Sequence, residues 1–408
     1  MNIVFYTLVL LACLFAAWGN LAGGEVDWMA AVGKGALDGA KGSVDLALSL
    51  VGAMTLFLGL MKVVEAAGGL DLMARLIRPV LVKLFPDVPP DHPAMGAMVM
   101  NLAANVLGLG NAATPFGIRA MQELEKLNKT PGVATDAMVL FLAINTSGVA
   151  VLPTGVIAMR ASLGSTNPAA IFTTTLLATS VNTVAAVLFA KTFARFFPGS
   201  TPGERHGTPV SWLALVPLIL LMSGFVALVA VVYHYGEKAS VWIIPMLILS
   251  MLTAGVVRKV KVYEVFIEGA RDGFNSAIRI IPYLVAILTS VGMFRASGAM
   301  DYVVRGLAPV CSLVGFPAEV LPLAILRPLS GSGAFALMGE LTKTYGPDTF
   351  IGQVAGTMQG TTETTFYVLA VYFGAVGVTR SRHAVLTGVL TDLAGVIASV
   401  FAVKLLLG

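Results

Sequence analysis

The sequence predicts an all-α polytopic membrane protein made of two homologous repeats, and three observations support this prediction. Of the 408 residues, 57% are hydrophobic and 12% are charged, and the mean hydropathy of +0.86 lies far above that of soluble globular proteins. Apolar runs of roughly 17 to 25 residues have the length of membrane-spanning helices. The second half of the chain also repeats features of the first half.

Charge and cysteine content exclude several other classes of protein. The formal net charge is +4, and most Lys and Arg residues stand between the apolar runs, so we interpret them as topology signals and expect no nucleic-acid partner. Cys13 and Cys311 lie in apolar stretches, where we expect packing residues rather than a disulfide or a metal site. The sequence lacks the common motifs of hydrolases, zinc proteases and nucleotide-binding folds. We therefore expect no enzyme, no catalytic residue, no cofactor and no metal site.

The first apolar run, residues 3–18, is predicted to be a transmembrane helix. Residues 10–13 faintly resemble a lipoprotein cleavage site, but no Lys or Arg precedes the run as it would in a signal peptide. An amphipathic, mildly acidic segment over residues 23–41 then leads into the apolar run 46–61.

An internal repeat begins in this region. Sliding the sequence by 230 positions superimposes ten identical residues over 42 positions, from Gly39 on Gly269 to Val80 on Val310. Gly, Pro, Asp and Arg are among these identities, so shared hydrophobicity does not account for them. We expect two homologous units, residues 1–205 and residues 206–408, the second of which includes a linking helix at 212–232.

Flanking charges predict how the two units lie in the membrane. The apolar runs 212–232 and 241–256 form a predicted hairpin with basic residues on both outer flanks, which the positive-inside rule places in the cytoplasm. The second unit then starts inside, whereas the first starts in a net acidic segment with Glu25, Asp27, Asp38 and Asp45. We therefore expect inverted repeats with broken or re-entrant helices that meet at the membrane midplane, as in many secondary transporters.

Two polar breaks interrupt apolar runs at corresponding places in the units, within residues 141–159 and residues 359–377. A small-residue stretch precedes each break, at residues 101–121 and 326–341. Gly, Ser, Asn and Pro at membrane depth favour short, broken helices that line a wet cavity. We expect a substrate site formed by Asn111, Thr114, Asn145, Thr146, Ser147, Arg327, Ser330, Ser332, Gln359, Thr361, Thr362, Glu363 and Thr364.

Charged residues in apolar surroundings give the sharpest hypotheses. Arg327 would cost roughly 2.5 to 3.5 kcal/mol at a helix centre and needs a partner, for which Glu363 is the candidate. This pair either binds a solute and relays a proton, or is a structural ion pair. Asp392 either couples transport to protons or sodium together with Glu363, or hydrogen-bonds a neighbouring helix. Four further polar residues either contact a polar ligand or cap broken helices: Asn101, Asn105, Asn111 and Thr114.

Longer motifs carry a resemblance to known families. The first half resembles the spore maturation protein A family in LGLGNAATPFGIRAM and NTSGVAVLPTGVIAMR. The second half resembles the spore maturation protein B family in PAEVLPLAILRPLSGSGA and TMQGTTETTFYVLAVYFGAVGV. The chain thus resembles a fusion of the two, and each half resembles the Gate, or nucleoside recognition, domain. The resemblance implies a multi-pass protein of the bacterial inner (cytoplasmic) membrane with a role in the cell envelope.

Three functions are compatible with these patterns. The first is a transporter or translocase of a small-molecule or lipid-linked solute, and the second is a scaffold for cell-envelope or spore-cortex maturation. The third is an intramembrane hydrolase that uses Glu363 or Asp392. A cavity at the repeat interface containing Glu363 and Asn145 would favour the first function, and a dry, packed interface the second. Further expected partners are membrane lipids and, in a homo-oligomer, other copies of the chain.

Overall fold

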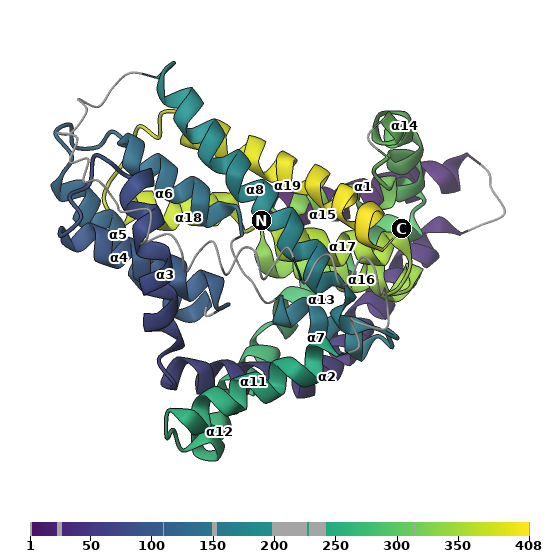
Figure 1. The fold of residues 1–408 in the computed structure, drawn as a ribbon. Coiled ribbons are helices and arrows are strands. Elements are labelled where there is room, and N and C mark those ends of the chain that lie inside the picture. Colours follow the sequence, from purple (N-terminus) through teal and green to yellow (C-terminus); the bar gives the residue numbers. More distant parts are fainter. Residues whose placement is uncertain are drawn as a thin grey trace.

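The computed structural model describes residues 2–22, 27–108, 110–148, 153–197, 227, 242–313 and 315–407, which are almost entirely α-helical (Figure 1). The first half contains α1 (Asn2–Leu21), α2 (Trp28–Ala66), α3 (Gly69–Leu84), α4 (Pro93–Val106), α5 (Gly110–Lys126), α6 (Asp136–Thr146), α7 (Thr154–Ser162), the 3-10 helix η1 (Pro168–Ala170) and α8 (Ile171–Ala194). The second half contains α11 (Ile243–Val257), α12 (Val262–Arg279), α13 (Ile281–Ala296), α14 (Ala299–Leu313), the 3-10 helix η3 (Ala318–Val320), α15 (Leu321–Leu326), α16 (Gly331–Tyr345), α17 (Phe350–Thr361), α18 (Thr365–Gly374) and α19 (Ala384–Leu406). The predicted linking helix at 212–232 and the predicted boundary near residue 205 lie outside the described residues.

The predicted all-helical membrane architecture is confirmed. Within the described ranges, four helical stretches are long and apolar enough to cross a membrane: Trp28–Ala66, Pro168–Ala194, Val262–Ala296 and Ala384–Leu406. From Trp28 onward, the amphipathic segment and the following apolar run form one continuous helix, α2, because no proline interrupts residues 28–66. The first apolar run is helical as predicted, in α1.

The long helix α2 packs against α12 and α13 through glycines that belong to the sequence repeat. A Cβ atom on Gly39 would lie 2.5 Å from the carbonyl oxygen of Leu288, and one on Gly269 would lie 2.7 Å from that of Leu58. The repeat superimposes Gly39 on Gly269 and Leu58 on Leu288, so this is one contact made in both directions. Such reciprocity is the property of an interface around a two-fold axis. Only glycine allows the two backbones to approach this closely.

Two hydrophobic cores each combine residues from both halves of the chain. The larger core packs Leu50 and Ile157 of the first half with Leu337 of the second. The other core packs Phe141 of the first half with Tyr372 of the second, and Figure 1 shows α18 among α4, α5 and α6 accordingly. The interface between the halves is therefore the interior of the protein.

Each half contains the broken helix predicted from its polar break, α6–α7 in the first and α17–α18 in the second. Ion pairs join the opposite ends of these two broken helices. Asp136 at the start of α6 accepts a hydrogen bond of 2.6 Å from Arg382 after α18, and Arg160 in α7 donates one of 2.9 Å to Asp348 before α17. The two broken helices therefore run side by side in opposite directions, and their breaks come together between the ion pairs.

Candidate functional site

The two polar breaks are in direct backbone contact. α17 ends where Thr362 adopts an extended backbone (φ −119°, ψ 161°), and the next residue, Glu363, donates its N–H to the carbonyl of Thr146 at 3.0 Å. Gly148 has a φ of +66°, and a Cβ atom there would lie 2.5 Å from the carbonyl oxygen of Thr361. The first break thus needs glycine both for its backbone conformation and for its approach to the second break.

Arg327 holds the second break in place. It lies between α15 and α16, only 4% exposed, and its guanidinium donates to the carbonyls of Thr362 and Gln359, the latter at 3.2 Å. It also donates to the hydroxyl of Thr364 at 3.2 Å. These bonds satisfy backbone carbonyls that the end of α17 leaves free, a condition for broken helices at membrane depth.

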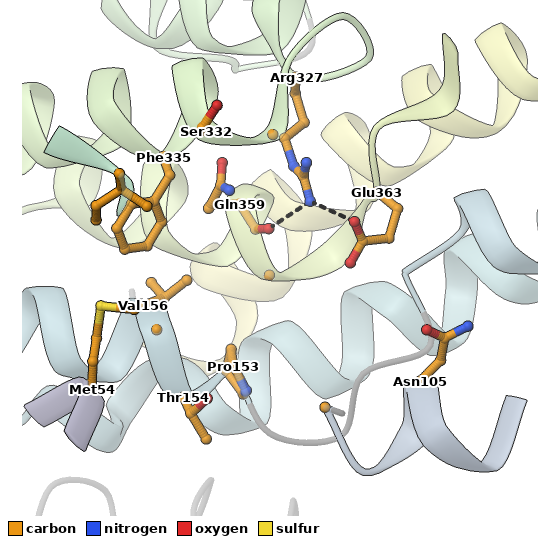
Figure 2. Close-up of a pocket in the computed structure, with 15 residues that line it drawn as sticks. Met54, Asn105, Pro153, Thr154, Val156, Arg327, Ser332, Phe335, Gln359 and Glu363 are labelled. Atoms are coloured by element: carbon orange, nitrogen blue, oxygen red, sulfur yellow. Dashed lines mark hydrogen bonds and ion pairs between the residues drawn. The ribbon is translucent and has the colours of Figure 1, made fainter. Parts of the chain in front are cut away.

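The expected Arg327–Glu363 pair is present, but it is loose. The guanidinium lies 3.7 Å from the Oε2 atom of Glu363, whose side chain is 52% exposed, against 5% for Arg327. Figure 2 shows the Glu363 side chain beside the pocket, with Arg327 reaching toward both Glu363 and Gln359. The Glu363 carboxylate therefore keeps much of its hydrogen-bonding capacity for a ligand.

Two cavities adjoin Glu363. One, of about 510 Å³, is lined by Thr114, Asn145, Ser330, Ser332, Glu363, Thr364 and the rings of Tyr283, Tyr367 and Tyr372, among other residues. The other, of about 460 Å³, includes Arg327, Ser332, Phe335, Gln359 and Glu363 in its lining, with Asn105, Pro153 and Thr154 on the facing side (Figure 2). Asn105, Gly331, Ser332 and Glu363 line both. Their combined walls come from both halves of the chain.

An amide and phenol network forms part of this lining. Asn105 donates to the Oδ1 atom of Asn145 at 2.8 Å, and the Tyr372 hydroxyl donates to the same atom at 3.3 Å. Asn101 in turn donates to the Tyr372 hydroxyl at 3.1 Å. The sequence prediction omitted Tyr372 from the site, because an aromatic residue in an apolar run does not reveal which way its ring and hydroxyl point.

Comparison with known proteins identifies the family. The Gate family, described as nucleoside recognition, matches residues 47–163 and 277–379, which is more than half of the chain. The chain belongs to the Gate family. The two Gate segments contain the first and the second break, respectively.

Two relatives of this Gate protein come from Bacillus subtilis (strain 168). Spore maturation protein B is 48% identical over 169 residues, which are 41% of this chain and 95% of the relative. Spore maturation protein A is 40% identical over 192 residues, which are 47% of this chain and 94% of the relative. Each relative corresponds to about half of the chain, so the predicted resemblance to a fusion of the two is confirmed.

Several residues of the predicted site lie behind the breaks instead of lining a cavity. Thr146 donates to the carbonyl of Ala143 at 3.0 Å, and Thr361 donates to that of Thr357 at 2.6 Å. The Ser147 hydroxyl lies 2.9 Å from that of Thr183. Thr362 is 1% exposed and, like the other three, lines neither cavity. For Asn111, which lies in α5, the side chain is outside the described part of the structure.

The predicted ion-coupling residue Asp392 lies behind the second Gate break. It is on α19, 5% exposed, and its Oδ1 atom accepts a hydrogen bond of 2.9 Å from Thr365 at the start of α18. It lines neither cavity. Asp392 therefore does not contact a solute in the cavities directly and would act on one only through the break.

One ion pair lies at a loop outside the membrane-spanning helices. Asp348 accepts hydrogen bonds from Arg160, from the Ser165 hydroxyl at 2.6 Å, and from the N–H and hydroxyl of Thr166. Burial alone would raise the pKa of Asp348, but the bonds from Ser165 and Thr166 and the charge of Arg160 hold this pKa below its usual value. Asp348 is thus a charged clamp between the two halves at neutral pH.

Proposed function

We propose that this Gate protein is a transporter or translocase of a small polar or envelope-related solute, with its site at the interface of the two repeats. The observation that carries the proposal is the cavity of about 510 Å³ lined by both Asn145 and Glu363. A dry interface would instead have favoured a scaffold. The volume lies in the range of small-molecule sites.

The chemistry of the lining indicates the kind of solute. Glu363 is the charged residue in the lining of this cavity, and the remaining polar groups are hydroxyls and amides. Carboxylate, amide and phenol oxygens accept hydrogen bonds from hydroxyl or amine groups, and the tyrosine rings offer flat apolar surface. A polar solute, or the polar head of a lipid-linked precursor, meets these requirements. The proposal includes no catalytic step and no cofactor.

We further propose that the two repeats are inverted in the bacterial inner membrane, which the chain crosses several times. The reciprocal contacts of Gly39 and Gly269 support a two-fold relation. The opposite directions of the two broken helices support an axis in the membrane plane, because such an axis reverses each helix. Alternating access at a site between inverted repeats would follow from movement of one repeat against the other.

The experiment has two stages. Metabolites of deletion and overexpression strains are compared to identify the solute, and its uptake is then measured in proteoliposomes. Glu363→Gln should remove uptake while leaving folding largely intact. The matched control is Glu340→Gln on α16, whose carboxylate pairs with Arg295 at 2.8 Å and lies outside both cavity linings. A stable and fully active Glu363→Gln protein would refute the proposed role of this site.

A further inference from the structure

The buried carboxyl group of Asp392 has one oxygen atom without a partner. Its Oδ1 atom is bound by the Thr365 hydroxyl at 2.9 Å, whereas its Oδ2 atom, fully buried, has no hydrogen-bond partner among the described residues. The Thr362 hydroxyl is also buried and unpartnered. Thr362 packs against α19, since a Cβ atom on Gly395 would lie 2.5 Å from its methyl group. An uncompensated carboxylate in such a place is strongly unfavourable.

The charges around Asp392 do not balance. The helices packed against α19 are α6, α8, α17 and α18, and the last two carry no charged residue. α6 has only Asp136, at its first residue, and α8 has only Lys191, in its last turn. Among the described residues, no ion pair or hydrogen bond joins Asp392 to a charged side chain, because Arg327 bonds to the second break and to Glu363.

Arg327 is the ion-pair partner of Glu363. The guanidinium therefore compensates the half-exposed Glu363 in the cavities and leaves the buried Asp392 behind the break without a cation in the described structure. Because a buried carboxylate without a cation is strongly unfavourable, Asp392 needs a cation or a proton from outside the described residues.

We propose that Asp392 is a proton-binding site of this protein, and that it exchanges its proton with solvent when the second break moves during transport. This inference rests on the proposed transport function. In the described arrangement, the Asp392 carboxylate binds a proton at Oδ2 and is neutral. Thr365, which binds the other oxygen of Asp392, begins α18 directly after the break, so movement of the break around a solute would open Oδ2 to water and release the proton. Solute uptake from one side is thus coupled to proton release.

A proton fits this site better than a metal ion. Protonation needs only the vacant Oδ2 atom, whereas hard metal cations need several oxygen ligands around them, and no cluster of three or more His, Cys, Asp or Glu side chains occurs among the described residues.

Infrared spectroscopy of the purified full-length protein tests the proposal without the solute. Difference spectra between acidic and alkaline buffer should contain the C=O band of a buried, protonated carboxyl group. This band should be lost in Asp392→Asn and retained in Glu363→Gln and in the control Glu340→Gln. Retention of the band in folded Asp392→Asn, or its loss in Glu363→Gln, would overturn the proposal.

A second variant and a second measurement cover the case in which Asp392→Asn does not fold. Thr365→Val keeps the shape of the side chain and removes the hydrogen bond to Asp392, so it should shift the band in frequency. An unshifted band would overturn the proposal. A sodium site would instead raise the melting temperature of the wild type in sodium chloride relative to potassium chloride, and would not raise that of Thr365→Val. This result would also overturn the proposal.

Transport measurements separate this inference from the proposed function. Absence of solute uptake with the titrating Asp392 band intact would reject the transporter and leave the proton site standing. Uptake by the wild type without any band that depends on Asp392 would reject the proton site and leave the transporter standing.

Discussion

Removing Arg327 should destabilise the protein far more than removing its acidic neighbour Glu363. In Arg327→Leu, the carbonyls of Gln359 and Thr362 and the hydroxyl of Thr364 lose their donor. Hydrogen bonds to charged groups contribute roughly 1.5 to 3 kcal/mol each, and loss of a buried charged partner costs about 3 to 5 kcal/mol. We expect the free energy of unfolding to fall by an amount in this second range.

Glu363→Leu should cost much less. Its side chain is 52% exposed and its contact with Arg327 is 3.7 Å long, and exposed ion pairs contribute about 0 to 1 kcal/mol. The double variant Arg327→Leu, Glu363→Leu should therefore be about as unstable as Arg327→Leu alone. The energy that couples the two residues should be within about 1 kcal/mol of zero.

Thermal unfolding of the four proteins in detergent, followed by intrinsic fluorescence, measures this double-mutant cycle. If the pair were primarily a structural ion pair, the double variant would recover most of the stability that either single variant loses. Recovery to near wild-type stability would refute the conclusion that Arg327 acts mainly on backbone carbonyls of its own repeat.

Three further predictions concern topology, packing and pH. In a background without the native cysteines, Asp27→Cys should react with an impermeant thiol reagent from outside and Lys261→Cys from inside; reaction of both from one side would contradict inverted repeats. Gly39→Ala should lower the free energy of unfolding by roughly 1 to 3 kcal/mol, the cost of an overpacked contact, because its Cβ atom would meet the backbone of α13 at 2.5 Å. A lower melting temperature would report this loss. Gly33→Ala, with nothing within 4 Å, should not lower it and serves as the control. Because the pKa of Asp348 is held below its usual value of about 3.9, its stabilising effect is complete above that pH and is lost as the pH falls through the lowered pKa. Asp348→Asn should therefore unfold more readily at neutral pH and lose part of the wild type's acid sensitivity, and an unchanged acid profile would contradict the clamp.

The sequence by itself determined the class of this protein, its duplication and the position of its breaks. Hydropathy is a local property, and a bilayer requires helices wherever an apolar run is long enough, so α1, α2 and α19 were predictable. The repeat could be recognised because close helix contacts tolerate only glycine at positions such as Gly39 and Gly269, so both copies have the same residue there. The polar break at Glu363 could be predicted because polar residues interrupt an apolar helix at membrane depth only where other groups of the protein satisfy them.

Only the tertiary structure decided which polar side chains of the breaks line a cavity. Asn145 and Thr146 are neighbours in one polar break, yet Asn145 lines the cavity of about 510 Å³, while the Thr146 hydroxyl turns back to the carbonyl of Ala143. A threonine hydroxyl can satisfy itself on its own helix, so composition does not tell a ligand-binding residue from a helix-bonding one. The loose contact of Arg327 with Glu363 and the separate position of Asp392 likewise depend on how α15, α17 and α19 pack together. Those distances arise between segments far apart in the chain, and no local pattern encodes them.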